Sequence, residues 1–279
     1  MMSVTNRESQ DTIQVPIRDI ETVVIEHPAT VVTTRLLAEL AHSGVSVIFC
    51  GSDHMPAGLE IPLNSNLNSP TITDLQLNTS KPLIKQLWKS IVQAKILNQA
   101  AVMKYLGHDD TELLAIASEV KSNDVTNREA VAAVEYFRRI IPNGGRWGSD
   151  YTSPLNYGYT IIRAGLARSI CSAGLIASKG IHHHNSLNPL NLADDLIEPF
   201  RPIMDAIVLK GDITSPLNHS GKLEMLKVHE TIVLFNGRRV SCQQAYTEST
   251  ASFINALTKA DASLLKTPSF IGLTRLNVI

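Results

Sequence analysis

Hydrophobic and polar residues alternate in the early part of the chain with the period of short strands. Three apolar runs have this period or the β-branched content typical of buried strands, at residues 13–17, 23–25 and 45–49. Before the last of them, residues 32–42 have a helical spacing that stops ahead of Gly44. Residues 64–80 are polar and rich in Asn, Ser and Thr, which predicts a loose domain boundary.

From Pro82 onward the apolar residues follow the spacing of amphipathic helices. Pro82 suits a first helical turn, and Gly107 suits the end of the same helix. The same spacing predicts further helices at residues 110–122, 127–141, 154–173, 190–209 and 243–257.

One strand pair is expected late in the chain, where Asn236-Gly237 separates two apolar runs and predicts a hairpin. Otherwise the second part of the chain is helical. The pattern therefore predicts an α+β multidomain fold, with a small β-rich domain at residues 1–75 and a larger all-α domain at residues 76–279.

Composition places the chain among ordinary globular proteins, with 44% hydrophobic and 18% charged residues. The polar start and the short apolar stretches argue against a secretory leader or a membrane span. Three cysteines lie far apart without CxxC spacing, which is typical of reduced thiols in a cytoplasmic protein. They are Cys50, Cys171 and Cys242.

The net charge of −1 excludes a protein coated in basic charge, but arginine is the only cation between residues 125 and 170. Arginine without lysine suits bidentate binding of phosphate. Pairing within a helix is the alternative, and Glu135 does lie four residues from Arg139. The arginines concerned are Arg128, Arg138, Arg139, Arg146, Arg163 and Arg168.

Residues 180–202, GIHHHNSLNPLNLADDLIEPFRP, combine three consecutive histidines with a following acidic helix. Asp195 and Glu198 are three residues apart, so both would point from one helix face. Pro199 and Pro202 should kink that helix just after Glu198. Imidazole and carboxylate are ligands of hydrolytic metal centres. An exposed histidine turn before ordinary first-turn acids is the alternative.

Glu129 is a second notable carboxylate. Residues 126–129, TNRE, match a capping box in which Glu129 folds back to the start of its helix. Glu129 also lies in register with the inward apolar stripe that includes Tyr136 and Ile140, where a bare charge is too costly. Capping and metal ligation therefore both stay open.

A site with one imidazole and two carboxylates would suit Mg²⁺ or Mn²⁺ better than structural zinc. No Walker loop, no GxGxxG after a strand and no GxSxG elbow supports another chemistry.

These motifs resemble a known family, the CRISPR-associated endonuclease/integrase that inserts new spacers (the Cas-one family). The histidine segment resembles the family signature, and three further stretches agree in order and spacing. They are LWKSIVQAKILNQAAVMKYLG at 87–107, TNREAVAAVEYF at 126–137 and SPLNYGYTIIRAGLARSICSAGL at 153–175. The segments LNYGY and LADDLIEPFRP are similar to those in the adaptation proteins of type II CRISPR loci. The resemblance covers nearly the whole chain.

The resemblance implies a catalytic, metal-binding triad of Glu129, His183 and Glu198, with Asp195 as an assisting acid. It implies a Mg²⁺- or Mn²⁺-dependent DNA endonuclease and integrase acting by phosphodiester transfer in adaptive antiviral defence. His182 and His184 are not the expected ligands. Candidate phosphate contacts to DNA are Arg138, Arg139, Arg146, Arg163 and Arg168.

The family's partners follow from the same resemblance. They are double-stranded DNA (spacer precursor and repeat), a second copy in a homodimer, the small second adaptation protein (Cas-two) and the type II effector nuclease. A prokaryotic cytoplasm is the expected location.

Residues 1–75 would form the dimerisation domain and residues 76–279 the catalytic, DNA-binding domain. Family members begin with about two further strands, so an incomplete N-terminal sheet with an open edge is expected.

Two other functions compete with this one. A catalytically dead DNA-binding or scaffold subunit would keep the fold without binding a metal. A zinc hydrolase built on the histidine triplet would instead lose activity to a zinc chelator and regain it with Zn²⁺.

Overall fold

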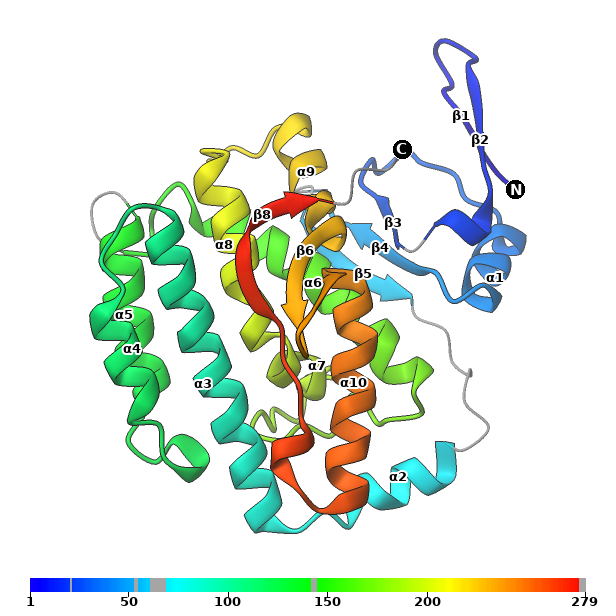
Figure 1. Ribbon diagram of the computed structural model, residues 1–279. Coiled ribbons are helices and arrows are strands. Elements are labelled where there is room, and N and C mark those ends of the chain that lie inside the picture. The colour runs from blue at the N-terminus through cyan, green and yellow to red at the C-terminus, as the bar shows by residue number, and fades with distance from the viewer. Residues whose placement is uncertain (21, 53–54, 61–68, 142–144, 276–279) are drawn as a thin grey trace.

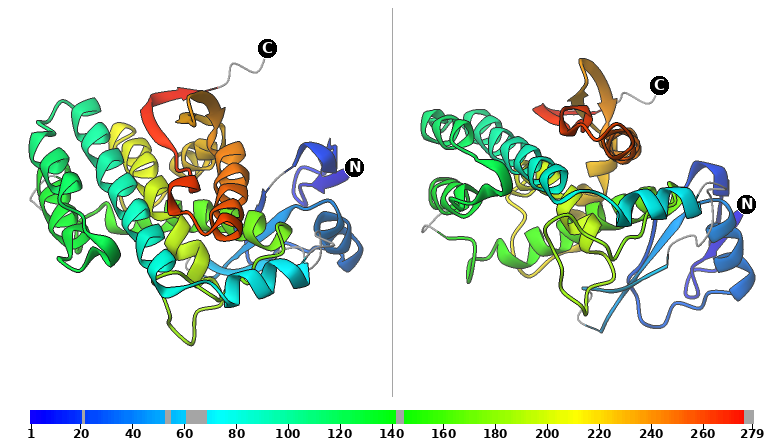
Figure 2. Two further views of the ribbon diagram at one scale, coloured as in Figure 1. Left: turned by 60° about the horizontal axis from the view of Figure 1, so that its bottom comes forward. Right: turned by 90° about the horizontal axis from the view of Figure 1, so that it is seen from below.

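The computed structural model describes residues 1–20, 22–52, 55–60, 69–141 and 145–275 (Figure 1). A small strand-rich part comes first and a mostly helical part follows, as the sequence predicts. The first part consists of β1 (Met2–Thr5), β2 (Thr12–Val15), β3 (Thr22–Ile25), α1 (Thr34–His42), β4 (Ser46–Cys50) and β5 (Pro56–Glu60). Figure 2 shows this part at one end of the molecule and helices α4 and α5 at the opposite end.

Two separate sheets make up the N-terminal part. Within the described residues, strands β1 and β2 pair only with each other, antiparallel, and project from the body as a hairpin (Figure 1). In the other sheet β3 runs parallel to β4, and β5 pairs antiparallel on the far side of β4. Parallel strands need a crossover, and α1 supplies it. Leu40 of this helix packs on Val45 and Val47 in a small core.

The larger part is built mostly from helices that share one apolar core. They are α2 (Ser69–Leu77), α3 (Lys81–Tyr105), α4 (Thr111–Ser118), α5 (Arg128–Ile140), α6 (Thr152–Ser172), α7 (Asn191–Leu196), α8 (Arg201–Lys210), α9 (His219–Leu226) and α10 (Cys242–Lys259). The long helix α3 begins after Ser80, whose hydroxyl accepts a hydrogen bond from the backbone of Leu83. It ends before Gly107, which has a positive φ of 88°.

The helix expected over residues 190–209 is interrupted near Glu198, as the two prolines suggested, but the break begins before Glu198 rather than just after it. Helix α7 ends at Leu196, the short 3₁₀ turn η3 (Glu198–Phe200) follows, and α8 then starts at Arg201. Pro199 and Pro202 lack the N–H groups that a continuous helix would need here. The kink places Glu198 at the junction of α7 and α8, beside α3.

The second part is not wholly α-helical. The predicted hairpin is present as β6 (Thr231–Phe235) and β7 (Arg238–Ser241), with Asn236 and Gly237 both at positive φ. A further strand, β8 (Ser269–Arg275), pairs with β6 and completes a three-stranded sheet in the order β7-β6-β8. The sequence pattern did not indicate β8, because its pairing joins segments far apart in the chain.

The prediction of a loose segment at residues 64–80 is wrong where the structure describes it, because α2 occupies most of it. Residues 61–68 lie outside the described ranges. The buried side chain of Gln76 anchors α2 through hydrogen bonds to the loop that precedes the histidines. Its amide nitrogen donates to the carbonyls of Ile176 and Lys179 at 3.1 and 2.8 Å, and its oxygen accepts from the Ile176 N–H at 2.8 Å. The boundary predicted between residues 75 and 76 therefore falls inside a helix.

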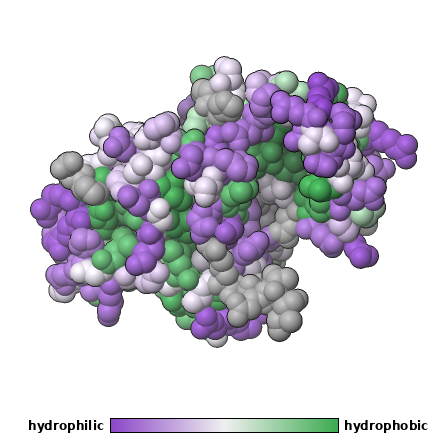
Figure 3. Space-filling model, turned by 90° about the horizontal axis from the view of Figure 1, so that it is seen from above, coloured by the Kyte–Doolittle hydropathy of each residue, from purple (hydrophilic) through white to green (hydrophobic). Residues whose placement is uncertain are grey.

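The surface seen from above is largely hydrophilic, with apolar side chains in separate patches (Figure 3). Among the described residues, none of the helices has both the length and the apolarity that a membrane crossing requires. Among the described residues no disulfide joins Cys50, Cys171 or Cys242, and Cys242 is buried.

Candidate active site

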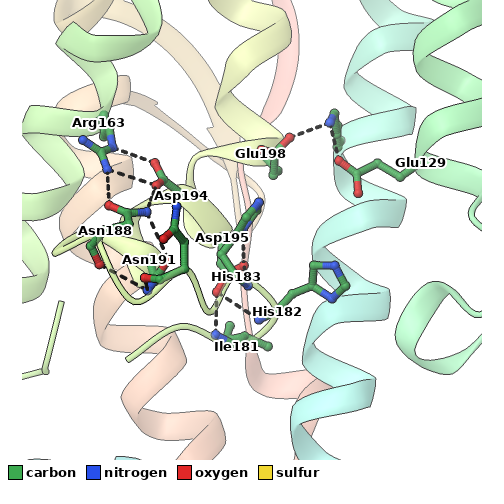
Figure 4. A network of polar contacts seen from close by, with 12 residues as sticks. Glu129, Arg163, Ile181, His182, His183, Asn188, Asn191, Asp194, Asp195 and Glu198 are labelled. Atoms are coloured by element: carbon green, nitrogen blue, oxygen red, sulfur yellow. Dashed lines mark hydrogen bonds and ion pairs between the residues drawn. The ribbon is translucent and has the colours of Figure 1, made fainter. Parts of the chain in front are cut away.

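Three elements that are distant in sequence meet at one amino group. Lys95 on α3 places its Nζ 2.6 Å from Oε1 of Glu129 on α5 and 2.5 Å from Oε2 of Glu198 on η3 (Figure 4). The Lys95 and Glu198 side chains are only 12% and 5% exposed, and Glu129 is 26% exposed. The structure thus brings together the two glutamates that the sequence singled out.

Glu129 does not form the capping box that its sequence suggested. The cap residue Asn127 has a left-handed backbone (φ 52°) and makes no side-chain capping bond. Instead, the carboxylate of Asp124 accepts from the N–H groups of Arg128 and Glu129 at 2.8 and 3.0 Å. Asp124 therefore caps α5, and the side chain of Glu129 reaches Lys95 on α3.

Glu198 is surrounded by cations. Arg201, one turn later, donates its Nε–H to Oε1 of Glu198 at 2.9 Å, while Lys95 contacts the other oxygen. Burial alone would raise the pKa of Glu198, but the charges of Arg201 and Lys95 outweigh it and hold the pKa at about 2. Glu198 is therefore a full carboxylate at neutral pH.

Arg201 itself rests on a buried polar cluster. Its guanidinium lies 4.6 Å from the centre of the Tyr159 ring. The hydroxyls of Tyr159 and Tyr136 both donate to Asp205, at 2.5 and 3.0 Å. Burial raises the pKa of Asp205 to about 6, against the effect of these two hydrogen bonds. The cluster fixes the position of Arg201 and, through it, that of Glu198.

His183 is held by Asp195, which is fully buried. The carboxylate of Asp195 accepts from the N–H groups of Ile181, His182 and His183 at 2.5, 3.1 and 3.1 Å (Figure 4). Its Oδ1 also lies 2.7 Å from Nδ1 of His183. A carboxylate only accepts, so Nδ1 carries a hydrogen and Nε2 is the nitrogen left for a ligand or substrate. This bond raises the pKa of His183 above its usual value, although burial opposes it.

The loop that carries the histidines is too tight for a side chain at Gly180. A Cβ there would lie 2.3 Å from the carbonyl oxygen of His183 and 2.7 Å from Oδ2 of Asp195. The glycine is thus needed for the close approach of backbone and carboxylate, rather than for a positive φ.

The three histidines have different surroundings. The ring of His182 stacks on the buried indole of Trp88, with centroids 4.2 Å apart and planes 3° from parallel. His183 is 42% exposed and bonded to Asp195, and His184 is exposed. In the described part of the chain, no set of three His, Cys, Asp or Glu side chains is placed to hold a metal. A zinc site on the triplet therefore has no support from this arrangement.

Asp194 turns away from the glutamates. It pairs with Arg163 of α6 at 2.6 Å and accepts from Asn188 at 2.6 Å (Figure 4). Arg163 also donates to the side-chain oxygen of Asn188 at 2.7 Å. These bonds tie the end of the histidine loop to α6 and α7.

Two of the candidate DNA-contacting arginines, Arg138 and Arg139, form ion pairs with acidic side chains. Arg138 is 61% exposed and pairs with Glu135 at 2.6 Å. Arg139 is 26% exposed, contacts Glu135 as the helical spacing suggested, and pairs with Glu112 at 2.6 Å.

Of the remaining candidates, Arg146 lies near aromatic rings. Arg146 donates to Asn156 at 2.8 Å and lies over the rings of Trp147 and Tyr159, with centroids 4.6 and 5.0 Å away. Arg168 borders a small cavity with His229. Their contact with DNA stays a prediction.

Lys95 is the site residue that the sequence reasoning missed. It lies one helical turn from Ile91 and from Gln99, both buried, so it falls within the inward stripe of α3. A lysine in such a stripe needs an oppositely charged partner, because burying an unpaired charge is too costly.

The chemical types of the candidate ligands, one imidazole and two carboxylates, suit Mg²⁺ or Mn²⁺. Oε2 of Glu198 is buried, and Nζ of Lys95 lies 2.5 Å from it. However, Lys95 stands between the two carboxylates, so the three groups do not converge as placed.

Comparison with known proteins points to one family. The family described as "CRISPR associated protein Cas1" matches residues 2–140 and 151–212. A CRISPR-associated endonuclease Cas1 from Neisseria meningitidis is 36% identical over 273 residues, covering 93% of this chain and 88% of that protein.

Solved structures agree in fold. A casposase bound to an integration product has a TM-score of 0.75 at 19% identity, covering 93% of this chain and 86% of that one. A CAS1 protein from Thermotoga maritima has a TM-score of 0.69 at 17% identity, covering 92% and 91%. A chain of a Cas6-RT-Cas1–Cas2 complex has a TM-score of 0.66 at 17% identity, covering 90% of this chain and 32% of that one.

Proposed function

The chain belongs to the Cas1 family of CRISPR-associated proteins, and on this premise we propose that it is a divalent-metal-dependent DNA endonuclease and integrase. It inserts new spacer DNA into a CRISPR array. The observation that carries the proposal is the meeting of Glu129 and Glu198 at one buried point, beside a histidine that Asp195 aligns.

Glu129, His183 and Glu198 are the residues that would hold Mg²⁺ or Mn²⁺, with Asp195 fixing the histidine. When bound, such a cation supplies Lewis-acid polarisation of a DNA phosphate. Asp195 keeps a hydrogen on Nδ1 of His183, so that Nε2 is the nitrogen that would bind a metal. Arg201 keeps Glu198 ionised and fixed.

The reaction is phosphodiester transfer. The 3′-oxygen of the spacer forms a new bond to phosphorus at the repeat boundary, and the bond to the repeat's own 3′-oxygen breaks, leaving a hydroxyl. With water as the nucleophile, the same displacement is DNA cleavage.

We infer the partners from the family and from the related complexes. Double-stranded DNA and Cas2 are supported by fold relatives that are a casposase bound to an integration product and a Cas1–Cas2 complex. A homodimer and contact with the type II effector nuclease are further parts of this proposal, supported by the family resemblance alone. Arg138, Arg139, Arg146, Arg163 and Arg168 are proposed to contact phosphates, which positions DNA without reading its sequence.

Metal removal tests the proposed activity. The purified protein, with duplex DNA bearing free 3′-hydroxyls and a repeat-containing target, should cleave and join strands when Mn²⁺ or Mg²⁺ is present. EDTA should abolish both products on a sequencing gel, and excess Mn²⁺ should restore them. Restoration by Zn²⁺ alone would favour the zinc hydrolase. No product with any of these ions, together with intact DNA binding, would favour the scaffold subunit.

The arginines of α5 offer a test of DNA binding. Replacing Arg138 and Arg139 together by glutamine should flatten the dependence of the DNA dissociation constant on salt. The slope should fall by about one for each phosphate that the variant no longer neutralises. Arg238→Gln is a matched control, since Arg238 on β7 is 58% exposed and pairs at 2.5 Å with Glu248 on α10. An unchanged slope in the double variant would reassign both arginines to their pairs with Glu135 and Glu112.

A further inference from the structure

Lys95 already occupies the position between the two acidic residues of the site. Its ammonium is shared by Glu129 and Glu198 at 2.6 and 2.5 Å, and its side chain is 12% exposed (Figure 4). The contact joins α3 to both α5 and η3. A buried lysine with two carboxylate partners is a specific arrangement, since each charge needs the others to offset its lost hydration.

The local charge is balanced. Lys95 and Arg201 supply one positive charge each, and Glu129 and Glu198 supply one negative charge each. Hard divalent cations bind where carboxylates leave excess negative charge and free oxygens. As paired here, the charges of these four groups cancel, so the excess of negative charge is missing, and this agrees with the lack of a three-ligand group among the described residues.

We propose that Lys95 is an internal competitor of the divalent cation. It holds Glu129 and Glu198 in place, and a metal ion can use their oxygens only when the ammonium moves out from between them. The inference rests on the proposed function, because it takes these glutamates as the metal ligands. Lysine suits the role, since its four-carbon chain is flexible and its compact charge makes no rigid fork like that of arginine.

Two physical consequences follow if Lys95 is replaced by methionine, which keeps the length and loses the charge. The two carboxylates then repel each other without a shared cation, which destabilises the metal-free protein. The metal ion no longer has to displace an ammonium, so it binds more tightly. Both effects raise the measured affinity for metal.

The experiment measures Mn²⁺ binding without DNA, by calorimetry and by the loss of the free-ion signal in electron paramagnetic resonance. Lys95→Met should bind Mn²⁺ at least tenfold more tightly than the unaltered protein. Its melting temperature should be lower without metal and should rise more on adding Mn²⁺. Lys85→Met, an exposed position on the same helix, should match the unaltered protein in both measurements. Lys95→Arg should bind Mn²⁺ no more tightly than the unaltered protein, since it restores a cation between the two carboxylates.

The outcomes separate this inference from the function on which it rests. If the unaltered protein binds Mn²⁺ and Glu198→Gln does not, the metal site stands. Equal or weaker binding by a folded Lys95→Met, checked by circular dichroism, would then overturn the competitor role. If neither the unaltered protein nor Lys95→Met binds Mn²⁺, both the competitor role and the metal-dependent function fail.

Discussion

His183→Ala should reduce DNA cleavage and strand transfer by at least about 100-fold with Mn²⁺ present. The reason is that His183 is the one imidazole, among the described residues, whose second nitrogen is fixed by a buried carboxylate, which prepares Nε2 for a metal. The variant should still fold, because the His183 side chain is 42% exposed. The measurement is product formation on labelled duplex DNA, alongside Mn²⁺ affinity by calorimetry.

His184→Ala is the matched control for this variant. His184 is exposed and adjacent in the chain, whereas the bond to Asp195 is made by the ring of His183. The control should keep activity within about twofold of the original, a difference of under about 1 kcal/mol in the barrier. Full activity in His183→Ala would show that the metal assignment is wrong.

Asp195→Ala should lower the free energy of unfolding by about 3–5 kcal/mol. The carboxylate is fully buried and accepts from three backbone N–H groups and one imidazole, all on the histidine loop. Alanine leaves these donors without a partner in a space that excludes water. Urea unfolding followed by circular dichroism would measure the loss.

Two further variants, Asp195→Asn and Asp194→Ala, serve as comparisons for Asp195→Ala. Asp195→Asn keeps one acceptor oxygen and should lose less stability, but its activity should fall with that of His183→Ala because the ring is no longer aligned. Asp194→Ala should cost about 1 kcal/mol or less, since Asp194 is 18% exposed and bonds partly exposed groups. A loss below about 0.5 kcal/mol for Asp195→Ala would mean that the loop is held by other contacts.

The sequence was most informative where local chemistry determines the structure. The prolines at 199 and 202 forecast the kink that places Glu198, and Asn236-Gly237 forecast the hairpin. The meeting of Glu129 with Glu198 came from the family resemblance, because it depends on how α3 and α5 pack. Periodicity alone cannot indicate which face of one helix contacts another.

Two failures have physical causes that can be named. The capping box was wrong because Asn127 takes a left-handed conformation, which lets Asp124 reach the first N–H groups of α5 instead. Helix α2 was missed because its residues are mostly polar. It is stabilised through Gln76 by carbonyl groups about a hundred residues away, and no local pattern contains that information.

Helix α2 also has a practical meaning for protein engineering. The histidine loop takes its position from Asp195 on one side and from Gln76 on the other, and Gln76 belongs to the segment that joins the two parts of the chain. A chimera that grafts a foreign N-terminal part at residue 76 would cut α2 in two and release that second anchor. The smallest transferable catalytic unit therefore starts ahead of α2, and a graft there should leave the geometry around His183 intact.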